Sequence, residues 1–489
     1  MPMPLGDLLA LAPELWLAGV GVALILLDLF VADDRKIVVG WAAIVGLMLG
    51  LLPTLGMLGL PGSGAQILPA RTVFFSTYAV DGFAVFFKII VIVSTILVIL
   101  SAMDYFRQQT RFEGELYILL TFTTLGLILM AGSADLILLA VSVEFVSLTS
   151  YVLAGYFKTS ARSNEAGIKY FLFGAGASAI MIYGFSILYG LTGQTNVYAI
   201  AERIRAAPTS ALVVALTLSL AGLGFKISMV PFHQWTPDVY EGAPTPVAAF
   251  LSVASKAAGF AALVRLLLVA IAPSRLDWVT LVAGLAALSM TVGNLLALPQ
   301  RNLKRMLAYS SIAHAGFLLI GVAAFKGDFG TPGLLIYLLA YTFTNLGAFF
   351  IAVLLEQRLG SGEIPDYAGL SQRAPVMAAL MALFMLSLTG IPPTAGFFGK
   401  FYLFGAAINN GLIWLAVVAI VNSVVALYYY VNVIRVMYLL PATSQEPVSG
   451  PPALQVALGI AAAGTLVIGL FPQPFINLVD VAVLLLRLP

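Results

Sequence analysis

The stretch that decides the fold is residues 220–256, LAGLGFKISMVPFHQWTPDVYEGAPTPVAAFLSVASK. It contains two apolar runs, one with Lys226 near its end and one with Lys256 in its middle, joined by a segment rich in proline. A charged side chain at bilayer depth costs about 3 kcal/mol or more, and such residues usually line ion or proton pathways. The stretch therefore predicts a transmembrane helix that proline interrupts beside a pathway for ions or protons.

The composition is that of a polytopic membrane protein. Of the 489 residues, 61% are hydrophobic and only 9% are charged, whereas a soluble protein is about 25% charged. A net charge of +2 argues against a nucleic-acid partner. The absence of cysteine excludes disulfides, thiolate-ligated iron–sulfur clusters and thiolate zinc sites, and two histidines are too few for a histidine metal centre. We therefore expect no metal and no cofactor in this chain.

Transmembrane spans follow from the rule that a helix needs about 20 apolar residues to cross a bilayer. The rule predicts an all-α polytopic membrane protein with 14 spans and short loops. The spans are expected at residues 11–31, 37–59, 80–103, 115–133, 135–157, 167–191, 210–241, 246–271, 277–298, 306–325, 332–355, 376–409, 413–439 and 452–471. The tail that begins at Phe475 is too short to cross.

Spans seven and twelve, at residues 210–241 and 376–409, are too long for one straight crossing, since about 30 residues of helix extend about 45 Å. They are interrupted at residues 228–231 and 390–393. The two spans lie five apart, which is an odd offset, so equivalent units built around them have opposite orientations in the membrane. Broken helices at matching positions of inverted repeats indicate a transport site. A simple proline kink in each span is the alternative.

Basic residues indicate the orientation of the chain. If the N-terminus lies outside, most loop lysines and arginines fall in the inner loops, among them Lys36, Arg107, Lys158 and Arg305. Cytoplasmic loops carry such an excess. An even number of spans then returns the C-terminus to the outer side of the membrane.

Four ionisable residues lie deep in the predicted spans: Glu144, Lys226, Lys256 and Lys400. A charge at that depth needs an opposite charge, polar side chains or water. A glutamate and a lysine about 5 Å apart interact by about 3 kcal/mol at an effective dielectric constant of about 20, which is enough to decide whether the lysine keeps its proton. We expect these residues to form a proton path. Structural ion pairs that hold the helix bundle together are the alternative.

Three further residues are candidate relays. His314 lies among small and hydroxyl side chains and either relays protons as a neutral imidazole or packs through hydrogen bonds. His233 either relays protons or satisfies the backbone that the break in span seven frees. Lys169, near the end of its span, is expected to extend its ammonium group toward the interface. Asp81 and Lys88 lie seven residues apart, on one helical face, and are expected either to pair or to let Lys88 extend in the same way.

Five segments together carry a family resemblance. They are SVEFVSLTSYVLAGY at 142–156, NEAGIKYFLFGA at 164–175, PFHQWTPDVYEGAPTPVAAFLSVASKAAGFAALVRLL at 231–267, GNLLALPQRNLKRMLAYSSIAHAGFLLIGV at 293–322 and LTGIPPTAGFFGKFYLF at 388–404. They resemble the N-type antiporter-like membrane subunits of NADH:quinone oxidoreductase, the respiratory complex I. The resemblance covers roughly residues 115–438 and extends weakly to both ends.

This resemblance implies a fold of 14 helices with two inverted five-helix repeats, each with a broken helix. The corresponding division places three N-terminal helices in residues 1–110, the first repeat in 115–271 and the second in 277–439. The last helix and the tail occupy residues 440–489. The three N-terminal helices depart most from the family, so their contacts with partner subunits stay open.

The resemblance also implies proton translocation in a large complex of an energy-transducing membrane, such as the bacterial plasma membrane. Glu144 matches the family's glutamate on the fifth helix, while Lys226, Lys256 and Lys400 match its lysines on helices seven, eight and twelve. In this interpretation Glu144 modulates Lys226, Lys256 relays the proton, and Lys400 exchanges it with the outer face. Lys400 also argues against the sister subunit M, which carries glutamate at that position.

The family's partners and cofactors follow in the same way. The chain is expected to be enzymatic only as a subunit of the translocase, because NADH, FMN, iron–sulfur clusters and quinone are bound by partner subunits. Its partners are other membrane subunits, including neighbouring antiporter-like ones. Three alternatives remain open: a subunit of a multi-chain cation/proton antiporter or membrane-bound hydrogenase, a stand-alone transporter for a small anion, and a structural spacer.

Overall fold

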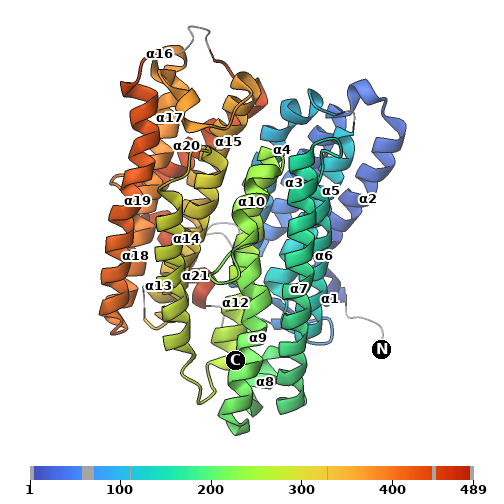
Figure 1. Cartoon of the computed structure of the whole chain (residues 1–489). Coiled ribbons are helices and arrows are strands. Elements are labelled where there is room, and N and C mark those ends of the chain that lie inside the picture. The colour runs from blue at the N-terminus through green and yellow to red at the C-terminus, as the bar shows by residue number, and fades with distance from the viewer. Residues whose placement is uncertain (1–4, 58–70, 111, 328, 443–447, 485–489) are drawn as a thin grey trace.

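A computed structural model describes residues 5–57, 71–110, 112–327, 329–442 and 448–484, and it is a bundle of long helices (Figure 1). Within this described part, strands are confined to a short antiparallel hairpin of β1 (Arg71–Val73) and β2 (Tyr78–Val80). Among the described residues, thirteen helices are long and apolar enough to cross a membrane, and the pair α17 and α18 forms a further crossing in two halves. The predicted all-α polytopic fold is confirmed.

The crossings agree with the predicted spans to within a few residues at most ends. The first six are α2 (Ala12–Phe30), α3 (Ile37–Gly56), α4 (Gly82–Arg107), α5 (Glu113–Gly132), α6 (Leu136–Ala154) and α7 (Ala161–Thr192). The next five are α9 (Thr209–Ile227) with α10 (Trp235–Gly242), the continuous helix Thr245–Ile271, α13 (Trp278–Ala297), α14 (Leu303–Ala323) and α15 (Gly330–Leu359). The last three are α17 (Pro375–Thr389) with α18 (Ala395–Asn409), α19 (Ile413–Leu439) and α20 (Pro452–Leu470).

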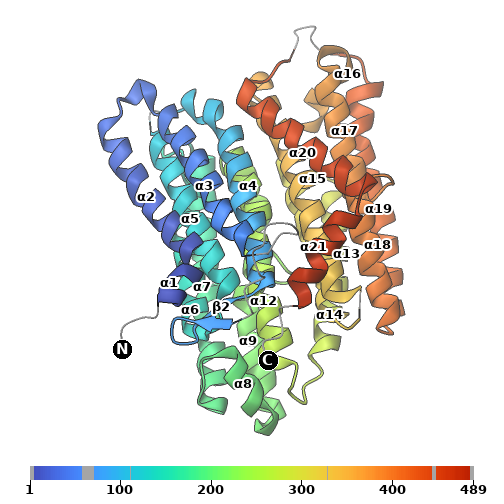
Figure 2. The same cartoon turned by 180° about the vertical axis from the view of Figure 1, so that it is seen from behind.

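Four further helices are short. They are α1 (Leu5–Ala10), α8 (Val197–Arg203), α16 (Leu370–Arg373) and α21 (Gln473–Leu484). In Figure 1, α8 and α16 lie at opposite ends, which we call the α8 end and the α16 end. The tail that was predicted not to cross forms α21, which packs against α4 and α15 on the back of the molecule (Figure 2).

Two isolated backbone bridges indicate an internal repeat. Asp135, just before α6, bridges to Asn196, and Asn302, just before α14, bridges to Glu363. The same shift of 167 residues separates Asp135 from Asn302 and Asn196 from Glu363. The first bridge borders α8 and the second lies close to α16, so the matching structures are at opposite ends of the bundle (Figure 1). This is the arrangement expected of two inverted units.

The two broken helices end in the same backbone conformation. The residues that follow α9 and α17, Ser228 and Gly390, have positive φ values of 62° and 94°. Polar side chains then satisfy groups that the interruptions free: Ser289 accepts a hydrogen bond from Val230 N at 3.1 Å, and Trp235 Nε1 donates to a carbonyl of α9 at 3.1 Å. Because a bilayer offers no water to open backbone groups, these partners are required for a helix to break at this depth.

Gly396 at the start of α18 gives the first testable prediction. A Cβ atom at this position would lie 1.8 Å from the carbonyl oxygen of Ser387, which is backbone and cannot move aside cheaply. Gly396→Ala is therefore expected to lower the unfolding free energy by about 1–3 kcal/mol. The assembled complex should lose thermal stability, whereas Gly176→Ala should not, since a Cβ at Gly176 meets nothing within 4 Å. Equal stability of the two variants would contradict the tight packing of this break.

Candidate functional site

Lys226 lies in the last turn of α9, directly before the break, with 2% of the residue exposed. Its Nζ atom donates a hydrogen bond to Ser147 Oγ on α6 at 3.1 Å. Glu144 lies one turn before Ser147 on the same helix, and its Oε1 atom is buried without a hydrogen-bond partner among the described residues. Glu144 and Lys226 thus occupy the same region of the bundle, but the lysine binds a hydroxyl group and does not form a direct ion pair with the carboxylate.

Lys256 lies at the centre of the continuous helix Thr245–Ile271, immediately after a π-helical turn at Leu251–Ser255. Such turns are frequent at functional sites. Lys256 Nζ donates hydrogen bonds to the backbone carbonyl and the Oγ atom of Ser311, both at 2.6 Å. Tyr341 OH donates to the same Oγ atom at 3.0 Å. The central lysine is therefore held only by neutral oxygen atoms.

His314 is hydrogen-bonded through both ring nitrogen atoms. Its Nδ1 atom lies 2.5 Å from Tyr337 OH, and its Nε2 atom lies 3.0 Å from Tyr430 OH. Tyr430 is hydrogen-bonded in turn to Ser310, the residue before the Ser311 that holds Lys256. The histidine is thus buried in a chain of hydroxyl groups that begins next to the central lysine.

Lys400 lies on α18, which follows the second break in the sequence. Its Nζ atom donates to the carbonyl oxygen of Thr389 at 2.8 Å and to Ser423 Oγ at 3.3 Å. It also lies 4.5 Å from the centre of the Phe317 ring, whose own centre is 6.0 Å from that of the His314 ring. We call His314, Tyr337, Tyr430 and Ser310 the His314 cluster. Lys400 approaches this cluster through Phe317, whereas Lys256 approaches it through Ser311.

Several buried hydroxyl groups in this region have no hydrogen-bond partner among the described residues. Five of them are on Ser150, Tyr170, Ser228, Tyr240 and Ser255. Ser228 follows Lys226 by two residues, and Ser255 directly precedes Lys256. Buried polar groups are almost always hydrogen-bonded to protein or to water, so these hydroxyls suit a hydrated region. The sequence analysis did not single them out, although serines next to deep lysines were a usable signal.

A family model described as NADH:quinone oxidoreductase/Mrp antiporter, TM, matches residues 133–426, which include all four deep residues. The subunit N of NADH-quinone oxidoreductase from Trichlorobacter lovleyi is 44% identical over 487 residues, covering 98% of each chain. The chain belongs to the NADH-quinone oxidoreductase subunit N family. Membership makes it an antiporter-like, proton-translocating membrane subunit that acts with other membrane subunits of an oxidoreductase complex.

Solved structures agree with this family. A chain of respiratory complex I from Thermus thermophilus with bound aureothin is 34% identical, with a TM-score of 0.80, over 95% of this chain and 98% of that one. A chain of the Mrp complex from Dietzia sp. DQ12-45-1b superposes with a TM-score of 0.85 over 98% and 97% of the two chains. At 22% identity the second likeness concerns the fold alone.

The structure shows neither of the two arrangements that we expected for Asp81 and Lys88: they do not pair, and Lys88 is buried and does not extend to the interface. Asp81 precedes the first residue of α4, where it accepts a hydrogen bond from Ala84 N and receives Arg265 at 2.8 and 3.1 Å. Lys88 pairs with Glu14 on α2 at 2.6 Å. The helical-face argument failed because Asp81 lies outside the helix, as its cap. Neither Glu14 nor Arg265 was a candidate, because nothing local to either residue shows which charge it meets.

The contacts of Lys169 and His233 differ from those expected from the sequence. Lys169 does more than extend to the interface: it pairs with Glu165 at 2.6 Å and with Asp238 on α10 at 2.7 Å. His233 is half-buried in the break of span seven, and its Nδ1 atom has no hydrogen-bond partner among the described residues. In the part of the chain that is described, no group of three or more histidine, cysteine, aspartate or glutamate residues is placed to hold a metal ion.

Proposed function

We propose that protons pass through this chain along Lys226, Lys256, the His314 cluster and Lys400. In this path Glu144 sets the charge state of Lys226, Lys256 is the central relay, and Lys400 exchanges the proton at the outer face. The hydroxyl groups between the lysines hold the water molecules that carry protons from one lysine to the next. Lys169 and His233 are candidate relays at its margins.

One contrast carries this proposal. Seven lysine and arginine residues are buried in the described chain. Four of them form ion pairs within 4 Å: Lys36, Lys88, Arg265 and Lys304. The other three, Lys226, Lys256 and Lys400, have no carboxylate within that distance and bind only hydroxyl or carbonyl oxygen atoms.

A buried cation without a counter-charge is costly and readily gives up its proton, whereas an ion pair holds the proton in place. The four paired cations therefore suit a structural role. The three unpaired lysines suit reversible proton transfer, because each can become neutral without leaving a carboxylate unpaired. This contrast favours the proton path over the structural alternative, in which all deep lysines hold the bundle together.

The proposal includes the division of the chain and its orientation. Residues 115–271 and 277–439 form the two proton-conducting repeats, residues 1–110 contribute the N-terminal helices, and residues 440–489 cross once more and end in α21. The α16 end, where the arginine- and lysine-rich loops lie, faces the inside of an energy-transducing membrane, and both termini face outward. NADH, FMN, iron–sulfur clusters and quinone are bound by partner subunits, and none by this chain.

Lys226→Ala tests the path. The complete complex in sealed vesicles is expected to lose proton pumping and quinone reduction together, by about 100-fold, since a positioned acid–base group typically contributes that much. Pumping is followed with a pH-sensitive dye, and assembly is checked on native gels. The control is Lys158→Ala, an exposed lysine, which should leave both activities unchanged. Full pumping by an assembled Lys226→Ala complex would return Lys226 to a structural role.

A further inference from the structure

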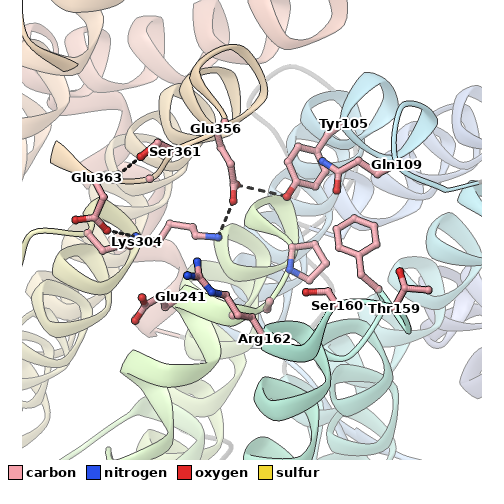
Figure 3. Close-up of a pocket in the computed structure, with 17 residues that line it drawn as sticks. Tyr105, Gln109, Thr159, Ser160, Arg162, Glu241, Lys304, Glu356, Ser361 and Glu363 are labelled. Atoms are coloured by element: carbon pink, nitrogen blue, oxygen red, sulfur yellow. Dashed lines mark hydrogen bonds and ion pairs between the residues drawn. The ribbon is translucent and has the colours of Figure 1, made fainter. Parts of the chain in front are cut away.

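A cavity of about 540 Å³ opens near the α16 end, between the two repeats (Figure 3). Its wall is strongly polar and combines side chains from distant helices. Tyr105 comes from α4, Glu241 from α10, Lys304 from α14 and Glu356 from α15. The two repeats and α4 of the N-terminal helices thus meet around a polar cavity, at the end where basic loops cluster.

Glu356 lies between this cavity and the interior. Its carboxylate accepts hydrogen bonds from Lys304 Nζ at 3.1 Å and Tyr105 OH at 3.4 Å, as the dashed lines in Figure 3 show. Thr245, the first residue of the helix that carries Lys256, donates to it as well. The Glu356 side chain is 27% exposed, whereas that of Lys304 is 8% exposed. Glu356 is therefore a carboxylate that water can reach from the cavity and that also contacts the helix leading inward.

A second polar step continues along the same two helices. Asn345 lies three turns from Glu356 on α15, and its Nδ2 atom donates to Ser252 Oγ at 2.7 Å. Ser252 is one turn before Lys256 on the facing helix, so it lies on the same side. The Oδ1 atom of Asn345 is fully buried and has no hydrogen-bond partner among the described residues. It is a buried acceptor on the helix that carries Glu356, next to a serine that lies one turn from Lys256.

Apolar residues, some of them small, lie between the two polar steps. Thr245 and Ser252 are seven residues apart, which is about 10 Å along a helix. Ala248 and Ala249 lie between them, and Ala352 lies between Asn345 and Glu356 on α15. The proposal below needs a short file of water molecules over this distance, with Asn345 Oδ1 as its inner anchor.

We propose that Glu356 is the proton-uptake group for Lys256. Its carboxylate takes a proton from water in the cavity, and the ion pair with Lys304 opens as the negative charge is lost. The proton then leaves Glu356 through water held by Asn345 and Ser252 and is accepted by the neutral amine of Lys256, after which the ion pair closes. This inference rests on the proposed role of Lys256 as a relay and adds the entry point of the path.

The pH dependence of the rate also depends on the other charged and titratable groups that face Glu356. They are Tyr105, Arg162, Glu241, Lys304, Glu363 and Tyr367. Glu363 offers a matched control, because it lines the same cavity but binds Asn302 on the opposite wall, away from Lys256. Replacing either glutamate with glutamine keeps the shape of the side chain and removes its ability to take up a proton.

The test uses the complete complex in vesicles. Glu356→Gln is expected to slow proton pumping and quinone reduction by about tenfold, since a proton-transfer group is lost. The loss of rate should be larger at about pH 8 than at about pH 6. Without the Glu356 carboxylate, protons must enter directly from water, and this entry slows as the proton concentration falls. A merely structural defect would not depend on pH in this way. Glu363→Gln should behave as wild type, and Glu356→Asp should restore much of the rate.

A second variant keeps the inference testable if Glu356→Gln assembles poorly. Asn345→Leu leaves the ion pair intact and should give the same pH-dependent loss. Wild-type rates at all pH values in either assembled variant would overturn the uptake role of Glu356. If Lys256→Met abolishes pumping in the same series, the proton path itself stands and only its entry is misplaced; if Lys256→Met also pumps normally, the proposed function fails.

Discussion

Replacing Lys256 with methionine is expected to abolish proton pumping and to slow quinone reduction by about 100-fold or more. Methionine fills nearly the same space, so packing around residue 256 changes little. The substitution removes the amino group that donates hydrogen bonds to the carbonyl and Oγ atoms of Ser311, and with it the group that can bind a proton at this position. In the proposed path, protons that leave Lys226 then have no group to accept them before His314.

The measurement compares proton release and quinone reduction in vesicles that contain the assembled complex. Lys326→Met is the matched control, because Lys326 is exposed in a loop at the α8 end and the same substitution there should change neither activity. A coupled complex should lose both activities together in Lys256→Met. Continued quinone reduction without pumping would mean that Lys256 moves protons but does not control turnover, and intact pumping would exclude it from the path.

Loss of the Arg265 guanidinium is expected to have the largest effect on stability. Arg265 is fully buried and donates two hydrogen bonds to Asp81 and one to Tyr198 OH. Arg265→Met would leave the Asp81 carboxylate buried without a counter-charge, which typically costs about 3–5 kcal/mol. Because Asp81 also caps α4, the variant should weaken the attachment of α4 to the helix that carries Arg265. The expected result is a large loss of assembled complex and a lower unfolding temperature.

A double variant separates charge from packing. Asp81→Asn combined with Arg265→Met removes both charges, while asparagine retains an oxygen atom that can cap α4. Replacing both partners of a buried ion pair is often nearly neutral, so the double variant should recover much of the stability that Arg265→Met loses. Equal losses in the single and double variants would show that the packing of Arg265, and not its pairing with Asp81, holds this region together.

The fold was largely predictable because a membrane imposes a fixed length. The bilayer thickness requires about 20 apolar residues per crossing, and this rule located all 14 crossings and both breaks. The rule did not predict the β1–β2 hairpin, α8 or α21. These elements have only three to twelve residues, which is too short for a rule based on the length of a membrane crossing to detect. These elements form where the surrounding helices offer them a surface.

The site was predictable only in part. The depth of Lys226, Lys256 and Lys400 can be read from the sequence, since each interrupts an apolar run. Their partners cannot, because Ser147 is 79 residues from Lys226 and Ser311 is 55 residues from Lys256. The pairing of Arg265 with Asp81 could not be predicted for the same reason, since these residues are 184 positions apart in the sequence.

The sequence by itself therefore determined the number and order of the crossings, the two breaks and the depth of three lysines. The physical reason is that hydrophobicity, helix length and proline act locally along the chain. Only the tertiary structure decided which buried cations meet a carboxylate and which meet only hydroxyl and carbonyl groups. That choice depends on which helices pack together, and it separates the four buried cations with a carboxylate partner from Lys226, Lys256 and Lys400, to which we assign the proton path.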